Sequence, residues 1–228
     1  MNKMIKRYVY FFSVALLVFS YKSSAQSKLS IPVLEKQIKV DGVIAQHEWQ
    51  QAAMIENLIS PWEAVDQDKT KFRTFISDTY FNFFFQVEDD TPITVPFKKE
   101  ASVAEGDRVE LFFSNDSTLT KYYCIEIDMN GKILDYSAKY YREFNDDWNF
   151  ESKVVAAKIT DTGYVVEGKI SLKELKELGI ANPFYLGVFR ADFKSHKQDD
   201  VTWFSWIKPV SSQADFHIPS AFEKVIMK

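Results

Sequence analysis

The last part of the chain holds the residues best suited to recognising a ligand. Trp203 and Trp206 lie close together, and Asp215 and His217 follow, with no helical or strand period through the stretch. A pyranose ring offers apolar faces that stack on indole rings, and hydroxyls that need carboxylate, amide, arginine or imidazole partners. Such a mixture of aromatic and polar groups is typical of a sugar-binding loop. The alternative is a C-terminal strand whose aromatic side chains fill a β-core.

A second group of candidates lies on stretches where apolar and polar residues alternate. Arg108 and Glu110 occupy alternate positions in one such stretch, so their side chains would point to the same side of a strand. Glu126 occupies one of the polar positions in a later stretch. If the two stretches form neighbouring strands, these charges project from one sheet face and could form a floor beneath a bound sugar. The alternative is a solvated sheet face whose charges neutralise one another.

Two further pairs are spaced so that their side chains share a face of an extended chain. Arg190 and Asp192 could donate and accept hydrogen bonds to neighbouring hydroxyls of a sugar. Asp215 and His217 have the same spacing. His217 directly precedes Ile218, and it could instead hold the loop by hydrogen bonding to the backbone.

The types of side chain present favour calcium over a transition metal. Cys124 is the single cysteine and the three histidines are scattered, so no spacing typical of zinc occurs. Calcium accepts carboxylate oxygens at flexible spacing, so adjacent acids in polar stretches are candidate ligands of a structural calcium ion. The candidate pairs are Asp89-Asp90, Asp146-Asp147 and Asp199-Asp200.

Two other functions stand as alternatives to sugar binding. A glycoside hydrolase would need two carboxylates about 5–9.5 Å apart, and Glu110 with Glu126 is the pair to consider first. A haem-binding electron-transfer domain could use Met54, Met129 and His217 as ligands, but the sequence has no Cys-x-x-Cys-His attachment motif. Nothing in the sequence marks a carboxylate pair with tuned pKa values, so binding without catalysis is the favoured interpretation.

The first 25 residues have the pattern of a secretory signal peptide. Basic residues precede an apolar run over residues 8–19, and Ser23-Ser24-Ala25 supplies small residues for a cleavage site. The apolar run is shorter than the roughly 20 residues that span a bilayer, and no cysteine follows it to carry a lipid anchor. The sequence therefore predicts a mature protein of residues 26–228 that is secreted or periplasmic and does not associate with a membrane.

Charge argues against nucleic acid as a partner. The chain has 28 Lys and Arg against 32 Asp and Glu, and residues 1–25 contain four of the basic residues and no acidic one. Residues 26–228 would therefore carry a net charge of −8, which disfavours binding to phosphates. Their number fits one β domain, and no Pro-, Gly- or Ser-rich linker divides them. We expect a single-domain monomer with a carbohydrate as its ligand.

Hydrophobic periodicity along the chain is that of β-strands. Alternation runs through residues 81–88, 108–113 and 122–129, and Asn130-Gly131 could close a type I′ hairpin after the last of these. Turn residues lie between further extended stretches, at residues 78–79 and 161–163, and residues 184–193 form another long strand.

Two short helices are predicted beside these strands. One covers residues 47–53, and the other covers residues 171–178, with Ser171 as the N-cap and Glu174 at the capping-box position. Many antiparallel strands with few helices indicate an all-β fold, namely an antiparallel β-sandwich with one or two short helices.

Several short motifs occur in the order seen in a known family. They are Val40-Asp41-Gly42 with Glu48-Trp49, Pro61-Trp62, Asp107-Arg108-Val109-Glu110, Tyr122-Tyr123 with Glu126, Phe189-Arg190-Ala191-Asp192, Ser205-Trp206, and Asp215-Phe216-His217 with Phe222. In this order and spacing the chain resembles the family 9 carbohydrate-binding modules, in particular their stand-alone bacterial branch. The likeness covers nearly all of residues 26–228. One departure is Glu223, which follows Phe222 where that branch usually has glycine.

The resemblance implies a β-sandwich that holds a sugar without catalysis, often with structural calcium. In the best-understood member a chain end is clamped between two tryptophan rings, and the matching motif positions nominate Trp62 and Trp206 as the two walls. Trp203 is a second candidate for the C-terminal wall, whereas Trp49 is expected in the core. The resemblance predicts a ligand that is a polysaccharide or oligosaccharide, and a role in carbohydrate catabolism.

Overall fold

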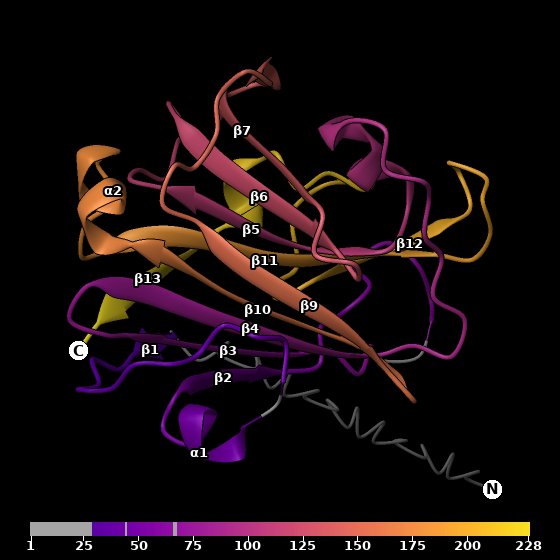
Figure 1. Cartoon of the computed structure of the whole chain (residues 1–228). Helices are drawn as coiled ribbons and strands as arrows, with labels where there is room; N and C mark the ends of the chain where they lie inside the picture. The colour runs from indigo at the N-terminus through magenta and orange to yellow at the C-terminus, as the bar shows by residue number, and fades with distance from the viewer. Residues whose placement is uncertain (1–28, 44, 66–67) are drawn as a thin grey trace, which may run out of the picture.

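The computed structural model describes residues 29–43, 45–65 and 68–228, which form two stacked β-sheets (Figure 1). The predicted all-β sandwich is therefore confirmed. The predicted signal peptide, residues 1–25, lies outside the described residues. Within the described ranges, no helix has both the length and the apolar character needed to cross a membrane.

The larger sheet has eight strands and the long strand β11 near its centre. Neighbouring strands follow the order β1-β13-β11-β5-β6-β7-β8, and β12 also pairs with β11. The strands are β1 (Ser30–Ile31), β5 (Arg108–Ser114), β6 (Tyr122–Asp128), β7 (Ile133–Lys139), β8 (Glu143–Asn145), β11 (Phe184–Phe193), β12 (Val201–Ser205) and β13 (Glu223–Met227). All pairings are antiparallel except that of β1 with β13.

The smaller sheet has five antiparallel strands in the order β2-β3-β4-β10-β9. They are β2 (Ala53–Glu56), β3 (Lys71–Ile76), β4 (Tyr80–Glu88), β9 (Val154–Thr160) and β10 (Gly163–Ser171). The predicted turns are confirmed, because residues 78–79 connect β3 to β4 and residues 161–162 connect β9 to β10.

The main apolar core lies between the two sheets and follows the predicted alternation. Val109, Leu111 and Phe113 of β5 belong to this core, and so do Ile125 and Ile127 of β6. The intervening side chains of both strands therefore point to the opposite, outer face of the larger sheet. Burial of these inward-facing apolar side chains is the main contribution to the stability of the sandwich.

A second apolar cluster covers much of that outer face. Phe112, Tyr122 and Phe189 from the sheet pack there with Phe216 and Phe222 from the segment around β12 and β13. Residues 206–222 connect these two strands, and the later part of this connection, with Phe216, Ile218 and Ala221, packs over the outer face of the sheet. The outer face is therefore covered here, whereas the alternation alone also allowed a solvated face.

A third cluster lies on the outer face of the smaller sheet. Trp49 is 1% exposed and packs on Phe75 and Phe84, with ring centroids 5.4 and 5.2 Å away. Its Nε1 donates a hydrogen bond to Glu167 Oε1 over 3.0 Å. The prediction that Trp49 is a core residue is confirmed.

Both predicted α-helices exist, with changes at their ends. Helix α1 (Gln46–Trp49) ends before residue 53, because Ala53 begins β2. Helix α2 (Leu172–Glu177) begins after Ser171, whose side chain caps it by accepting from Lys173 N over 3.1 Å. The capping box was predicted wrongly, since the Glu174 carboxylate accepts from the backbone of residues 151 and 152 instead. Short 3-10 helices also form at η1 (Glu100–Glu105) and η2 (Pro219–Ala221).

The hairpin between β6 and β7 forms where it was predicted, but not as a type I′ turn. Of Asn130 and Gly131, only Gly131 has a positive φ, +74°, whereas type I′ needs two such residues. Asp128 closes the turn instead. Its Oδ1 accepts hydrogen bonds from the backbone N–H groups of Asn130 and Lys132, each over 2.8 Å.

Candidate functional site

A cavity of about 220 Å³ opens on the outer face of the larger sheet, beside the second apolar cluster. It is lined by Arg108, Glu110, Glu126, Arg142, Trp203, Ala214, Asp215, Phe216 and His217. Most of the residues predicted to contact a sugar therefore meet in one place. They come from β5, β6, β12 and the segment after β12, so only the folded sandwich brings them together.

The floor of this cavity is a buried cluster of charged side chains. Arg108, Glu110 and Glu126 are all 5% exposed or less, although they lie on a sheet face that could have been solvated. Arg108 Nε donates to Glu126 Oε2 over 2.5 Å and lies 3.0 Å from Glu110 Oε1. The single Nε–H points at Glu126, so Glu110 Oε1 has an ionic contact but no hydrogen bond within the described residues. A ligand hydroxyl could supply the missing hydrogen bond.

The rest of the floor is fixed by the protein itself. Arg108 Nη1 donates to the carbonyl oxygens of Ala104 and Gly106, over 3.2 and 3.3 Å. Tyr136 donates its hydroxyl to Glu126 Oε1 over 2.8 Å. These polar groups are therefore oriented before any ligand arrives, which lowers the cost of binding one.

The Glu110 carboxyl is the unusual titrating group of this floor. Burial, followed by the neighbouring Glu126 carboxylate, raises the pKa of Glu110 to about 8, against the opposing effect of Arg108. Glu110 is thus largely protonated near neutral pH. In that form it can donate a hydrogen bond to a hydroxyl as well as accept one.

We expect the Glu110→Gln change to alter the pH dependence of stability. A carboxyl whose folded-state pKa is raised destabilises the fold once it ionises, so stability is lost as pH rises from about 4.5 through about 8. The neutral variant has no such loss, and its unfolding free energy relative to wild type should increase between pH 5 and pH 9. Urea denaturation at these pH values measures this. Glu105→Gln, an exposed control, should show no trend, and a pH-independent difference for Glu110→Gln would contradict the burial argument.

Two aromatic side chains form the wall of the cavity. Trp203 is half-buried, and its ring meets Phe216 edge-on, with centroids 5.5 Å apart and planes at 83°. The Arg108 guanidinium lies 5.4 Å from the centre of the Trp203 ring. Trp62 contacts the same Phe216 at 5.7 Å and donates its Nε1 hydrogen to Ser211 O over 3.1 Å. Trp62 supports the wall but does not line the cavity.

His217 lies among aromatic rings at the side of the cavity. Its Nδ1 is 3.1 Å from the Tyr122 hydroxyl, so the ring pairs with a side chain rather than with the backbone as the alternative proposed. Its ring centroid is 5.1 Å from those of Phe112 and Phe144. Burial, then Arg142, lowers the pKa of His217 to about 3, so the imidazole stays neutral and can exchange hydrogen bonds without carrying charge.

Asp215 ties a neighbouring loop to the rim. Its Oδ2 accepts from the Tyr141 hydroxyl over 2.6 Å, and its Oδ1 accepts from Arg142 Nη2 and from His217 N over 3.0 and 2.9 Å. Burial alone would raise the pKa of Asp215, but these hydrogen bonds and Arg142 lower it, so Asp215 is ionised. Sequence reasoning missed Tyr141 and Arg142, because they lie in a loop outside any alternating stretch.

The predicted clamp of Trp62 and Trp206 is wrong. Trp206 is 8% exposed and belongs to the main core between the sheets, whereas Trp62 packs on the second cluster at the outer face. The two rings therefore lie on opposite sides of the larger sheet. Trp203, the second candidate, is the tryptophan that lines the cavity.

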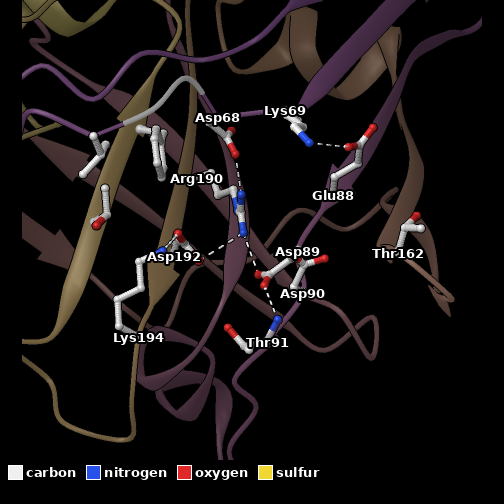
Figure 2. Close-up of a pocket in the computed structure, with 13 residues that line it drawn as sticks. Asp68, Lys69, Glu88, Asp89, Asp90, Thr91, Thr162, Arg190, Asp192 and Lys194 are labelled. Carbon is white, nitrogen blue, oxygen red and sulfur yellow. Dashed lines mark hydrogen bonds and ion pairs between the residues drawn. The ribbon is translucent and has the colours of Figure 1, made fainter.

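Arg190 and Asp192 line a different cavity, of about 420 Å³, together with Asp89 and Asp90 (Figure 2). They share a face as predicted, but they are engaged with each other and with nearby acids. Arg190 Nη2 donates to Asp89 Oδ2 and Asp192 Oδ1 over 2.6 and 3.1 Å, Nη1 pairs with Asp68, and Lys194 pairs with Asp192. The structure does not bring this pair together with Trp203.

Two residues of this cavity, Asp89 and Asp192, belong to the best candidate for a calcium site among the described residues, and the third, Asp107, is not part of the cavity lining. Asp89, Asp107 and Asp192 each offer an oxygen, and these oxygens lie within 4.8 Å of one another, as around one calcium ion. With Asp68, the cluster has four carboxylates against the two cations Arg190 and Lys194. The charge and spacing therefore fit a divalent cation. The predicted pairs Asp146-Asp147 and Asp199-Asp200 are exposed and do not join this cluster.

Two further features of this cluster agree with a missing positive charge. Burial, and then the nearby Asp89, raises the pKa of Asp107 to about 7, although its oxygens accept from the backbone of Ile93 and Phe193. The Tyr164 hydroxyl interacts electrostatically with Arg190 and Asp107, and it is fully buried without a hydrogen-bond partner in the described structure. Such an orphaned group often marks a bound ion or water.

The residues considered for haem binding are not brought together. Met129 lies in the main core and Met54 is exposed on β2, whereas His217 lines the cavity of the outer face. Two iron ligands need to face one another across the haem. These three positions do not offer that arrangement.

A scan against family models matches residues 40–228 to the carbohydrate family 9 binding domain-like family. The chain belongs to this family. The match includes every residue of the cavity and of the Arg190 cluster. A comparison with curated proteins found no match.

Solved structures with the same fold extend this result. A protein from Bacteroides uniformis, for which carbohydrate binding has been suggested, has a TM-score of 0.70 and 13% identity, over 88% of this chain and 98% of that one. A family 9 module from Caldicellulosiruptor kristjanssonii has TM-scores of 0.57 in complexes with glucose and with cellotriose, at 17% and 15% identity. Each of these covers 87% of this chain, and 95% and 93% of the module. At such identities the likeness concerns the fold, and the family match supports a carbohydrate-binding role.

Proposed function

We propose that the protein binds one sugar ring of a polysaccharide or oligosaccharide in the cavity on the outer face of the larger sheet. The ring stacks on Trp203, and its hydroxyls bond to Arg108, Glu110 and Asp215. The observation that carries this proposal is the buried floor, where Glu110 Oε1 has no hydrogen-bond partner among the described residues and lies in the same cavity as an aromatic wall. An apolar surface next to convergent, unsatisfied polar groups matches the chemistry of a sugar.

Binding without catalysis is the second part of the proposal. The raised pKa of Glu110 resembles that of a general acid, which is the one observation in favour of a glycoside hydrolase. However, Glu110 and Glu126 contact the same Arg108 nitrogen, which lies between their carboxylates. A hydrolase needs the scissile bond in that position. The arrangement supports recognition of hydroxyls over cleavage of a bond.

A binding screen combined with a turnover assay tests this function. Calorimetric titration with gluco-, xylo- and manno-oligosaccharides should identify at least one ligand, and incubation with the same sugars should release no new reducing ends. Turnover that is abolished by Glu110→Gln would replace the binding function with a hydrolase. If no neutral sugar binds, the chain shares only the fold of its family.

We also propose that the chain is exported after cleavage near Gln26, and that it supports carbohydrate catabolism as a secreted or periplasmic monomer. The support for export is the pattern of residues 1–25 described above. The intact mass of the exported protein tests the cleavage site, and its sedimentation tests the oligomeric state. A product that retains residues 1–19 in the membrane would contradict export.

A structural calcium ion at Asp89, Asp107 and Asp192 is a separate proposal. An ion that binds only the folded state at about a hundred times its Kd adds about 2.7 kcal/mol, or roughly 5–10 °C in Tm for a chain of this size. Thermal denaturation should therefore shift upwards with calcium and downwards with a chelator. Asp89→Asn should remove the shift, and Asp199→Asn, an exposed control, should retain it. Equal Tm values with calcium and with chelator would contradict the calcium site. They would mean that Arg190 and Lys194 neutralise the carboxylates without a metal ion.

A further inference from the structure

Exposed aromatic side chains gather beside the proposed sugar site, in the connection from β7 to β8 and on β8 itself. Tyr140, Tyr141 and Phe144 are 51%, 52% and 44% exposed. Among the described residues, Phe97, at 45%, is the one other large aromatic side chain with a comparable exposure. A group of exposed rings at one place marks a contact surface more strongly than single exposed residues do.

This connection is fastened to the wall of the cavity rather than projecting freely. Tyr141 and Arg142 both donate to Asp215, and Asp215 and Arg142 line the cavity themselves. On the other side, Tyr140 N donates to Leu119 O over 3.0 Å. The rings are thus held at the rim, at a fixed position relative to the cavity floor.

The rings also support one another. Tyr140 and Tyr141 meet edge to face, with centroids 5.4 Å apart and planes at 67°. Phe144 packs edge-on against His217, a cavity residue, at 5.1 Å and 74°. Tyrosine rings held in this way lose little conformational freedom when a ligand stacks on them, which favours them as binding surfaces.

The cavity is too small to hold a whole oligosaccharide. Sites for drug-sized ligands usually have about 300–1,000 Å³, and this cavity, at about 220 Å³, has room for a small unit only. A longer ligand must therefore continue past the rim. Arg142 and Asp215 neutralise one another there, so the surface beyond the cavity suits an uncharged chain.

We propose that the loop of Tyr140, Tyr141 and Arg142 is a second subsite, which stacks on the sugar unit that follows the one in the cavity. The inference rests on the proposed function and restricts the class of ligand. It assigns the protein a neutral oligosaccharide chain of at least two units as its ligand, rather than a monosaccharide.

The test compares ligands that differ only in length. Calorimetric titration with glucose, cellobiose and cellotriose, and with the matching xylose and mannose series, gives the gain in affinity from each added unit. In the series that binds, the wild type should gain about three- to tenfold from the second unit, which corresponds to one aromatic stacking contact. Tyr140→Ala should remove most of this gain while affinity for the monosaccharide stays within about twofold, because Tyr140 does not line the cavity.

Tyr80→Ala is the matched control, since Tyr80 is a half-buried tyrosine on the smaller sheet, remote from the cavity. It should leave both affinities unchanged, and circular dichroism should show that both variants are folded. Equal affinity of the wild type for one, two and three units would overturn the second subsite while the proposed function stands. Failure of every monosaccharide and oligosaccharide to bind would overturn both.

Discussion

Replacing Trp203 by alanine is expected to weaken binding of the sugar about tenfold or more. The Trp203 ring lines the cavity and meets Phe216 edge-on, beside the Arg108 guanidinium. An aromatic contact contributes roughly 0.5–1.5 kcal/mol beyond area burial, and a stacked sugar adds the burial of its own apolar face. Calorimetric titration of the wild type and the variant with the tightest ligand measures the difference.

Trp206 supplies the matched control for this experiment. Its ring belongs to the main core, so Trp206→Phe should lower the free energy of unfolding while the Kd for the sugar changes little. The opposite pattern would contradict the site, namely full affinity in Trp203→Ala together with lost affinity in folded Trp206→Phe. That result would indicate that Trp206 forms the wall of the site, as the sequence motif suggested.

Replacing Trp49 by alanine is expected to lower the free energy of unfolding by about 3–5 kcal/mol. The ring is 1% exposed and packs against Phe75 and Phe84, so its removal leaves a cavity under α1. It also removes the hydrogen bond to Glu167, which is fully buried and, among the described residues, would keep the backbone N–H groups of Asp41 and Gly42 as its donors. Urea denaturation with a two-state fit measures the loss.

The Trp49→Phe variant separates the two causes, because it keeps most of the ring volume and removes the Nε1 donor. We expect a smaller loss than in Trp49→Ala, and unchanged sugar affinity in both variants at a temperature where they are folded. The cluster of Trp49 lies on the smaller sheet, away from the cavity. A loss below about 1 kcal/mol in Trp49→Ala would contradict the buried packing described here.

Strand parity is the part of the fold that local sequence predicts well. Val109, Leu111 and Phe113 alternate with Arg108 and Glu110, and this period of two sets which side chains enter the core between the sheets. Sequence also placed Glu126 on the same face. It could not show that the charged face would be buried, because that depends on the segment around Asp215, Phe216 and His217 folding back over the sheet.

The error with Trp206 has a related physical cause. Trp203 and Trp206 are three residues apart, and β12 ends at Ser205 between them. The alternation nevertheless continues one residue past the strand, so Trp206 packs in the core with Phe204, whereas Trp203 has the opposite parity and stays outside. A motif position in a family likewise does not determine which of two nearby rings faces the ligand.

Arg190 and Asp192 show a different limit of sequence reasoning. Their spacing placed them on one face correctly, but their partners Asp68 and Asp89 come from distant segments that only the folded sandwich brings close. Arg142 was missed for the same reason, since its role depends on Asp215, far away in the sequence. Which residues form ion pairs across long sequence separations depends on how the strands and loops pack in the folded protein. Local patterns in one sequence do not predict these pairs.

A crystal structure of the protein with its tightest oligosaccharide would locate the bound sugar directly. We expect one sugar ring in the cavity, stacked on Trp203, with hydroxyls within hydrogen-bond distance of Arg108 and Glu110. A sugar bound instead in the cavity of Arg190, or on a surface away from both, would contradict the proposed site.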